Sequence, residues 1–338
     1  MAVIKVEGLC KSFAVKKKPP GLKGSVQSLF RPVYAEKRAV EGIDFEVKEG
    51  EKVAFLGPNG AGKSTTIKML TGILHPTSGT ADVLGYCPWK DRSRLAFRIG
   101  SVFGQKSQLW YHLPVMDSFE LMGSIYELGK TAFADRRDEL VHRFGLEPFL
   151  PIPVRKLSLG ERMRCEIAAA LLHRPRVVFL DEPTIGLDVV VKQTIREVIL
   201  EMNRREGCTI FLTTHDAGDI EQLCDRAIVI NHGRIALDDT VASMKSSFLK
   251  YKTVELKLKE PAAGISLPGV RVVQSGTALK LSVDTTAASI EEVLGFLTAR
   301  CRIEDVTIQD PPLEETIAKL YAAERETPAG GERKEAVT

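Results

Sequence analysis

The sequence GPNGAGKS at residues 57–64 constrains the fold of this chain more than any other stretch. It matches the pattern GxxxxGK[ST] of a phosphate-binding loop. The residues before it, 52–56, predict a buried strand. The residues after it predict a helix with one face formed by Ile67, Leu70, Thr71 and Leu74. Inward-turned backbone N–H groups and the positive end of a helix dipole favour an anion at such a junction, so the sequence predicts a strand–loop–helix unit that binds phosphate groups.

The loop and the residue after it are the expected contacts of a phosphate chain: Gly57, Pro58, Asn59, Gly60, Ala61, Gly62, Lys63, Ser64 and Thr65. The amine of Lys63 is expected to reach the β- and γ-phosphates, and the hydroxyl of Ser64 to ligate Mg²⁺. The alternative is an ordinary glycine-rich turn. It is disfavoured because a chance cluster of glycines rarely carries both the Lys-Ser pair and the two flanking elements.

The composition limits the possible classes of protein. The chain has 338 residues, of which 44% are hydrophobic and 27% charged, which is enough for a large core and a smaller second module. Its six cysteines form no CxxC pair, which argues against a zinc cluster or a disulfide framework and favours a reducing cytosol. No run reaches the roughly 18 apolar residues that a membrane-spanning helix needs. We therefore expect a two-domain chain that is soluble on its own.

The positive charge is concentrated in one segment. The formal net charge is +3, but residues 14–38 hold seven basic residues and one acid, so the rest of the chain is negative. This local excess argues against a surface that coats nucleic acid. Two interpretations of the segment stay open. It is either a solvated, partly disordered insertion or a basic amphipathic helix around Val26, Leu29 and Phe30 that touches lipid headgroups.

Three uninterrupted apolar runs predict strands of a parallel sheet that is covered on both faces. They lie at residues 177–180, 208–212 and 227–230. A helix predicted at 189–205 separates the first two runs. This alternation of strand and helix is typical of a doubly wound α/β core.

Two further regions extend this core. Strands predicted at 3–6 and 43–47 indicate an N-terminal antiparallel β layer. Between about residues 106 and 173 helical patterns dominate, with breaks near Gly129 and at Gly145. The second region is therefore predicted to be a helical insertion.

The pattern changes beyond about residue 248. Alternating strands and one helix predict a small accessory α+β domain over residues 249–325, and a last amphipathic helix is expected at 313–320. Residues 326–338 cannot bury enough apolar surface to become ordered. The main domain is accordingly predicted to span residues 1–248.

A pair of carboxylates follows one of the core strands directly. Asp181 and Glu182 come after residues 177–180, and the carboxyl ends of parallel strands meet at the ligand-binding edge of such a sheet. Asp181 is expected to hold Mg²⁺ through water, and Glu182 to polarise a water for attack on the γ-phosphate. A helix N-cap or turn is the alternative for Asp-Glu-Pro, and the strand before it makes that alternative weaker.

Several motifs follow one another along residues 3–240: the phosphate-binding loop, Gln105, LSLGE at 157–161, Asp181 with Glu182, GLD at 186–188, and His215. Their order and spacing resemble the nucleotide-binding subunits of ABC transporters. The resemblance implies the ABC ATPase fold, a P-loop NTPase core with a parallel sheet, an N-terminal antiparallel β layer and a helical insertion. It also implies ATP and Mg²⁺ as cofactors and ATP hydrolysis as the activity.

The resemblance also implies roles within one subunit. Glu182 would be the general base, and His215 would hydrogen-bond the γ-phosphate. Gln105 would contact Mg²⁺ and the attacking water. The metal contacts would thus be Ser64, Gln105 and Asp181.

Other motifs would act on the nucleotide of a second subunit. Ser158 and Gly160 lie at a predicted helix N-terminus, which suits a γ-phosphate. Asp188 belongs to the GLD motif, which the resemblance also places beside the nucleotide. The resemblance therefore implies a head-to-tail homodimer, or a pair with another ATPase subunit, that encloses two ATP molecules.

Two departures from the family pattern stand out. The usual LSGGQ motif is LSLGE here, with Leu159 in place of the first glycine and Glu161 in place of the glutamine. We expect activity with altered dimer affinity. The aromatic residue that stacks on adenine is either Phe13 or Tyr34, because the basic segment splits the usual spacing.

Three features of the sequence resemble those of ATPases that pair with ABC-2-type permeases. They are the LSLG sequence, DEPTIGLD at 181–188, and the basic insertion at 14–38. An aromatic stretch at 109–114 is either the border of a groove for a permease helix or ordinary packing. The resemblance implies a peripheral motor subunit on the cytoplasmic face of the inner membrane. It would drive export through separate permease subunits, with no nucleic-acid partner.

Two other functions are alternatives to transport. A soluble ABC ATPase of translation or DNA repair is disfavoured by the single phosphate-binding loop and the short helical insertion. A nucleotide-gated regulatory module that binds ATP without hydrolysis is disfavoured by the intact Lys63, Glu182 and His215.

Overall fold

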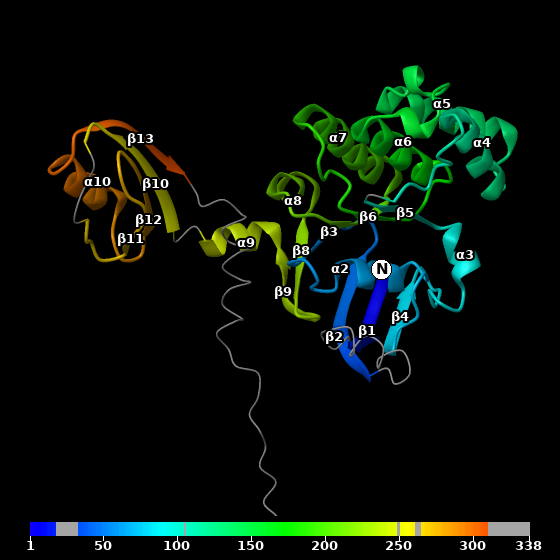
Figure 1. Cartoon of the computed structure of the whole chain (residues 1–338), viewed down its shortest axis with the longest axis horizontal. Coiled ribbons are helices and arrows are strands. Elements are labelled where there is room, and N and C mark those ends of the chain that lie inside the picture. Colours follow the sequence, from blue (N-terminus) through cyan, green and yellow to red (C-terminus); the bar gives the residue numbers. More distant parts are fainter. Residues whose placement is uncertain (18–32, 105, 249–250, 261–264, 310–338) are drawn as a thin grey trace, which may run out of the picture. The chain divides into compact units, whose positions relative to one another are not determined.

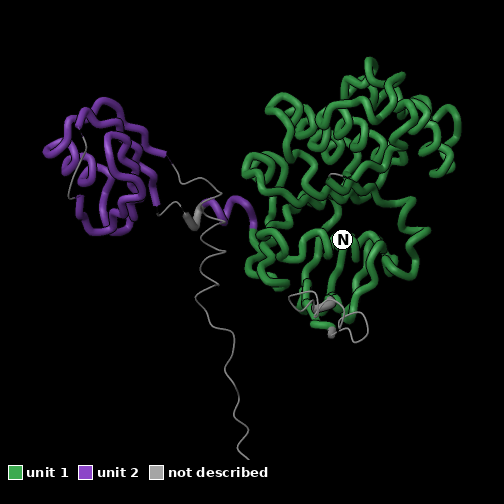
Figure 2. Tube along the Cα trace, viewed as in Figure 1, with its two compact units in different colours: residues 1–239 green, residues 240–338 purple. Residues whose placement is uncertain are grey.

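The computed structural model describes residues 1–17, 33–104, 106–248, 251–260 and 265–309. The chain divides into two compact units, Met1–Asp239 and Thr240–Thr338 (Figure 2). The helix expected near Val26, the side chain of Gln105, the helix expected at 313–320 and the tail from 326 lie outside the described residues. Among the helices of the described ranges, none is long and apolar enough to cross a membrane.

Unit 1 begins with a three-stranded antiparallel sheet. Strand β1 (Ala2–Lys17) lies between β2 (Val33–Lys48) and β4 (Ser78–Val83). The N-terminal β layer is thus confirmed, but its first two strands are much longer than the predicted 3–6 and 43–47. The hydrogen-bonded ladder continues through Ala14↔Glu36 to Lys17↔Val33, so both ends of the basic segment are extended β structure.

The second sheet of unit 1 carries the P-loop. It has the strand order β5-β6-β7-β3-β8-β9. Its strands are β5 (Ile99–Phe103), β6 (Val177–Asp181), β7 (Thr209–Thr213), β3 (Lys52–Leu56), β8 (Arg226–Asn231) and β9 (Arg234–Thr240). The pairs from β5 to β8 are parallel, and the apolar side chains of the three predicted runs are almost fully buried. This confirms the α/β core, with β3 and β6 separated only by β7.

Helix α2 (Lys63–Leu70) starts directly at the P-loop. The predicted helical face ending at Leu74 is too long, because Thr71 is the C-cap and Gly72 has φ +71°. A glycine in this left-handed conformation is a common helix stop. A short helix, α3 (Arg92–Ala96), precedes β5.

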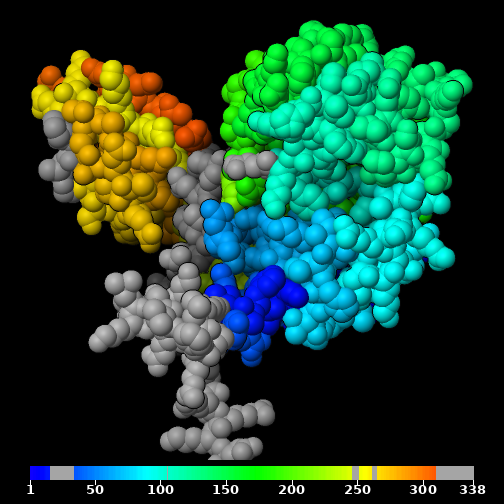
Figure 3. Space-filling view, turned by 45° about the vertical axis from the view of Figure 1, so that its right-hand side comes forward, coloured from blue at the N-terminus to red at the C-terminus, as the bar shows by residue number. Residues whose placement is uncertain are grey.

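The helical insertion lies between β5 and β6 in the chain. It contains α4 (Val115–Ile125), α5 (Lys130–Phe144), two short 3₁₀ helices at Glu147–Phe149 and Val154–Lys156, and α6 (Leu159–Leu171). The left-handed Gly145 ends α5, as its sequence pattern predicts. Figure 1 shows α4, α5 and α6 grouped on the side of the parallel sheet away from the N-terminal strands, and Figure 3 shows their cyan-to-green atoms as one continuous mass.

A buried arginine attaches this insertion to the core. Arg136 of α5 is 1% exposed and donates to the carboxylate of Glu206 at 2.7 Å and to the carbonyl of Leu171 at 3.2 Å. Glu206 ends α7 (Val189–Glu206), which together with α8 (Ala217–Leu223) belongs to the α/β core. One guanidinium therefore joins three helices.

Unit 2 begins with α9 (Val241–Phe248) and contains a four-stranded antiparallel sheet. The sheet order is β11 (Val270–Gln274), β12 (Ala278–Asp284), β10 (Tyr251–Leu258), β13 (Ile303–Gln309). Helix α10 (Ile290–Thr298) starts with a capping box between Ser289 and Glu292, and its Val293 and Leu297 join the buried core. The predicted α+β character is confirmed, although strand β11 was not predicted.

Candidate functional site

The P-loop has a backbone that requires glycine. Gly60 and Gly62 have φ values of +83° and +115°, which L side chains rarely adopt. A Cβ atom on Gly62 would also lie 2.5 Å from the carbonyl oxygen of Ala39. These glycines let the loop turn tightly between β3 and α2, with the first N–H groups of α2 at its end.

Lys63 is a buried cation held by neutral groups. Its side chain is 6% exposed, and its Nζ donates to the carbonyl of Gly57 at 2.6 Å and lies 3.1 Å from Nε2 of His215. Burial lowers the pKa of Lys63, while the charges of Glu182 and Asp181 act in the opposite direction. A desolvated ammonium with neutral hydrogen-bond partners fits the anion that a phosphate chain would supply.

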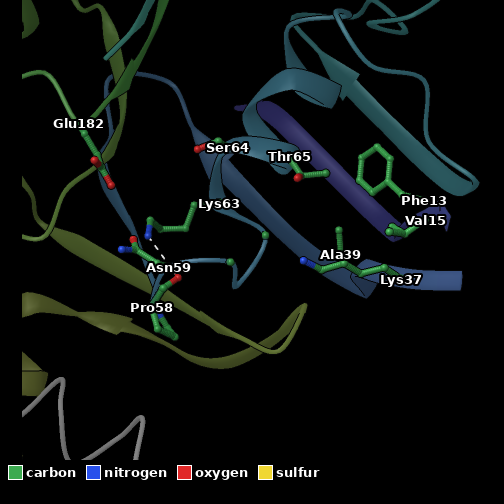
Figure 4. Close-up of a pocket in the computed structure, with 12 residues that line it drawn as sticks. Phe13, Val15, Lys37, Ala39, Pro58, Asn59, Lys63, Ser64, Thr65 and Glu182 are labelled. Carbon is green, nitrogen blue, oxygen red and sulfur yellow. Dashed lines mark hydrogen bonds between the residues drawn. The ribbon is translucent and has the colours of Figure 1, made fainter. Parts of the chain in front are cut away.

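A pocket of about 310 Å³ opens beside this lysine (Figure 4). It is lined by Phe13, Val15, Lys37, Ala39, Pro58, Asn59, Gly60, Gly62, Lys63, Ser64, Thr65 and Glu182. Figure 4 shows Phe13 and Glu182 at opposite ends of this lining. The pocket therefore offers an aromatic ring at one end, the P-loop along its wall and a carboxylate at the other end.

The pocket contains one of the two candidate aromatics. Phe13 lines it and is 37% exposed, and the ammonium of Lys11 lies 5.3 Å from the centre of its ring. Tyr34 is not in the lining. Phe13 pairs with Lys37 and Lys16 pairs with Tyr34, so the odd spacing along β1 puts Tyr34 on the opposite face of the ladder.

The strand ends beside the P-loop hold Asp181 in place. Its Oδ1 accepts hydrogen bonds from Thr213 Oγ1 at 2.6 Å and from Ser64 Oγ at 3.3 Å. No cluster of three or more His, Cys, Asp or Glu side chains that could hold a metal exists in the part of the chain that is described. One carboxylate and one hydroxyl nevertheless fit Mg²⁺, because this ion retains waters and takes further ligands from bound phosphates.

Glu182 has an unusual backbone. Its φ of +54° lies in the left-handed region, and its N–H donates to the carbonyl and the hydroxyl oxygen of Thr213 at 3.0 and 3.1 Å. Its carboxylate lies 3.1 Å from Nε2 of His215. Non-glycine residues adopt this conformation rarely, and those that do are concentrated at functional sites.

His215 is electrostatically biased toward its neutral form. Burial lowers its pKa, the charge of Lys63 lowers it further, and Glu182 acts in the opposite direction. The loop after Glu182 and the residue before His215 are joined through Asp219, a fully buried carboxylate in α8. Asp219 accepts hydrogen bonds from Thr184, from Thr214 at 2.8 Å and from Nε of Arg196 at 2.8 Å.

The LSLGE motif has a local structural explanation. Ser158 is the N-cap of α6 and forms a capping box with Glu161, whose carboxylate accepts from the Ser158 N–H at 2.8 Å. Such a box stabilises a helix start and forms with either glutamate or glutamine at this position, so Glu161 keeps the local structure that the usual motif would have. Leu159 lies beside Gly186, since a Cβ atom added to that glycine would lie 3.3 Å from Cδ2 of Leu159.

The predicted site residues fall into two groups. The P-loop residues, Phe13, Asp181, Glu182 and His215 come together around the pocket and Lys63. Ser158 and Gly160 belong to the start of α6, and Asp188 is the N-cap of α7, where it accepts from the N–H of Val191 at 2.9 Å. None of these three residues lines the pocket as it is described.

Sequence reasoning missed Thr213 and Lys37. Thr213 ends strand β7, directly after an apolar run, and its hydroxyl contacts Asp181. The rule that selected Asp181, a polar residue at the carboxyl end of a core strand, also points to this threonine. Lys37 lay within the segment interpreted as an insertion, and only its pairing with Phe13 shows its relation to the pocket.

Comparisons with known proteins agree with this geometry. The family model described as "ABC transporter" matches residues 40–185. The chain is 32% identical over 303 residues to the "Daunorubicin resistance ATP-binding protein DrrA3" of Streptomyces coeruleorubidus, which covers 86% of this chain and 94% of that protein. It is 30% identical over 299 residues to the "Linearmycin resistance ATP-binding protein LnrL" of Bacillus subtilis (strain 168), with coverage of 86% and 96%.

A solved structure has the same fold. It is described as "Dimeric structure of a post-hydrolysis state of the ATP-binding cassette MJ0796 bound to ADP and Pi". The TM-score is 0.59 at 24% identity, and the match covers 70% of this chain and 98% of that one.

Proposed function

The chain belongs to the family of ABC transporter ATP-binding proteins and is therefore an ABC-type ATPase, and from this premise we propose that it drives export through separate membrane subunits. The observation that carries the proposal is the arrangement around the P-loop, in which Glu182 lines the same pocket as the loop, Asp181 contacts Ser64, and His215 contacts both Lys63 and Glu182. The names of the two relatives, both resistance proteins, favour export over a role in translation, DNA repair or regulation.

We propose that the nucleotide lies along the P-loop. Its adenine stacks on Phe13, its phosphates follow the loop from Pro58 to Thr65, and Lys63 reaches the terminal phosphates. The support is the pocket itself, in which Phe13 and Lys63 share a single cavity. Tyr34 takes no part, because it lies on the other face of the ladder.

Glu182 is the proposed general base. Its carboxylate accepts a proton from the water that attacks the γ-phosphate, a role that contributes about 10²–10⁴-fold to the rate. His215 contacts the γ-phosphate from its position beside Lys63, and Gln105 is assigned to the attacking water on the motif order alone. The short contact between Glu182 and His215 supports a shared site of action.

Mg²⁺ is the proposed metal, held by Ser64 and Asp181 with Gln105, and it would neutralise charge on the phosphates. The support is the hard oxygen donors of Ser64 and Asp181, which lie 3.3 Å apart. The hydrogen bond from Thr213 would keep the Asp181 carboxylate oriented for this ion.

Each chain supplies only part of a complete site in this proposal. Ser158, Gly160 and Asp188 lie outside the pocket and at helix starts, where the positive end of the helix dipole favours a partner's γ-phosphate. Two copies, or this chain and a second ATPase subunit, would therefore close head to tail over two ATP molecules. The solved relative described as dimeric is consistent with this arrangement.

The membrane partner is proposed to be an ABC-2-type permease, with the ATPase bound at the cytoplasmic face of the inner membrane. Trp110 and Tyr111 are 38% and 52% exposed between β5 and α4. Exposed aromatic side chains are frequent in protein interfaces, which supports docking at this border of the helical insertion.

The test uses the purified full chain with ATP and Mg²⁺, alone and on membranes that contain its co-expressed partner. We expect Glu182→Gln to reduce hydrolysis by about 10²–10⁴-fold and to accumulate an ATP-dependent dimer in light scattering. The control is Glu197→Gln on the exposed surface of α7, which should hydrolyse ATP like the wild type. The proposal fails if Glu182→Gln stays monomeric under both conditions or retains turnover.

A further inference from the structure

The β1–β2 ladder extends one wall of the nucleotide pocket. Lys37 is the cross-strand partner of Phe13, and cross-strand partners lie on the same face of an antiparallel pair. Val15 follows Phe13 by two residues and lies on that face as well. All three line the pocket, so the start and end of the basic insertion belong to the nucleotide site.

The position of Lys37 in this wall is specific. Figure 4 shows its side chain running from β2 past Ala39 toward the P-loop, between Phe13 and Asn59. Its neighbours in sequence, Glu36 and Arg38, alternate to the opposite face, where they form an ion pair at 3.9 Å. Lys37 has no ion pair with any residue of the described ranges and is exposed in the open pocket.

The charges of the pocket lining favour an anion beside Lys37. Its titratable lining groups are Lys37, Lys63 and Glu182, and Glu182 lies at the end away from Phe13. The amine of Lys63 donates to the P-loop carbonyl of Gly57, and the proposed function assigns it to the terminal phosphates. Lys37 therefore adds a second ammonium to this lining, and the one carboxylate among the described lining residues, Glu182, lies at the other end.

We propose that Lys37 binds the α-phosphate of the nucleotide, an inference that rests on the proposed function. If the base stacks on Phe13 and the terminal phosphates lie at Lys63, the wall between them faces the ribose and the α-phosphate. An ammonium prefers the phosphate oxygen, because a charge-assisted hydrogen bond is about twice as strong as a neutral one. The basic insertion thus contributes directly to nucleotide affinity through the strand that leads out of it.

Loss of the Lys37 ammonium should weaken the binding of nucleotides. Loss of one charged hydrogen bond should weaken binding by about 10-fold or more. The loss should be similar for AMP, ADP and ATP, since all three carry the α-phosphate. Hydrolysis by Lys37→Met should show a raised KM with little change in kcat, because the contact exists in both the ground state and the transition state.

The experiment is calorimetric titration of the full chain with AMP, ADP and ATP. The variants are Lys37→Met and Lys37→Glu, and the matched control is Arg38→Met, which removes the same charge from the other face of the same strand. We expect Lys37→Met to bind about 10-fold more weakly, Lys37→Glu more weakly still, and Arg38→Met like the wild type. Equal melting temperatures of the four proteins would exclude a folding defect.

Three results would overturn the inference. These are unchanged affinity in Lys37→Met, equal losses in Lys37→Met and Arg38→Met, or a loss confined to ATP, which would place the contact at the γ-phosphate. If Lys37→Glu binds ADP as well as Lys37→Met, the contact is not with an anion and the inference also fails. Absence of nucleotide binding by the wild type would instead refute the proposed function.

Discussion

Nε2 of His215 lies 3.1 Å from the carboxylate of Glu182, and the same nitrogen lies 3.1 Å from the ammonium of Lys63. A single ring nitrogen cannot donate to a carboxylate and accept from an ammonium at the same time. With a proton on Nε2, His215 binds Glu182 and repels Lys63. Without it, His215 accepts from Lys63 and leaves Glu182 free. The proton on this imidazole thus decides which of the two proposed catalytic groups it holds.

The pKa of His215 should therefore respond in opposite directions to two substitutions. We expect it to lie below its ordinary value of about 6.5 in the free chain. Lys63→Met should raise it, because a repelling cation is removed. Glu182→Gln should lower it further, because the stabilising anion is lost. NMR titration of the His215 ring protons measures all three values, and the assignment comes from His215→Gln. Identical titration curves in the wild type and both variants would contradict this account.

Phe13→Ala should weaken ATP binding by about 10-fold, because an aromatic stacking partner contributes roughly 0.5–1.5 kcal/mol beyond the area it buries. Tyr34→Ala is the matched control on the opposite face of the ladder and should bind ATP like the wild type. Fluorescence titration with a labelled ATP analogue provides the measurement. A loss in Tyr34→Ala with none in Phe13→Ala would reverse the assignment.

His173 should make the stability of the chain depend on pH. Its Nε2 lies 2.9 Å from the carbonyl of Ile99 and its ring stacks on Tyr126. Its buried Nδ1 has no hydrogen-bond partner among the described residues. Burial lowers the pKa of His173 to about 4. The unfolded chain binds this proton near pH 6.5, so stability should fall as the pH decreases from about 6.5 to 4.

The size of this loss follows from the shift in pKa. A difference of about 2.5 pKa units corresponds to about 3 kcal/mol of unfolding free energy. His173→Gln keeps a donor for Ile99 but does not titrate. Urea unfolding at pH 7 and at pH 4 measures the change in unfolding free energy for each protein. Between these pH values, the wild type should lose about 3 kcal/mol more unfolding free energy than His173→Gln. Parallel losses in the two proteins would mean that His173 is not the responsible group.

Arg136→Met should destabilise unit 1 by about 3–5 kcal/mol, because it leaves the carboxylate of Glu206 without its buried partner. Arg137→Met is the control on the next position of the same helix, where the ion pair with Asp138 lies at the surface. We expect a change of under about 1 kcal/mol for this control. Thermal unfolding followed by circular dichroism compares the two. Equal melting temperatures would show that the three-helix junction does not depend on Arg136.

The sequence predicted the centre of the fold well because its signals are local. Several signals specify their structure within a few residues. They are the P-loop glycines, the apolar runs that form β6, β7 and β8, and the left-handed glycine after α5. The same holds for Asp181 and Glu182, whose position follows from the strand before them. Parallel strands bring their carboxyl ends to one edge without further information.

The errors came from features that depend on distant residues. Residues 14–17 and 33–36 belong to the segment that was interpreted either as a solvated insertion or as a basic amphipathic helix. They instead pair with each other as strands, although they are far apart in the sequence. Strand β11 is an edge strand with exposed side chains, so it lacks a clear alternation of buried and exposed positions. The choice between Phe13 and Tyr34 likewise needed the register of the ladder, which spacing in the sequence does not provide.

The single hydroxyl of Thr213 joins two of the proposed roles, because it donates to Asp181 and accepts from the N–H of Glu182. A protein engineer who wished to impair this motor could therefore leave every acidic and basic residue in place. Replacing this one buried threonine with the isosteric valine would loosen the proposed metal ligand and the proposed general base together. Screens of charged residues alone would overlook such a weakness.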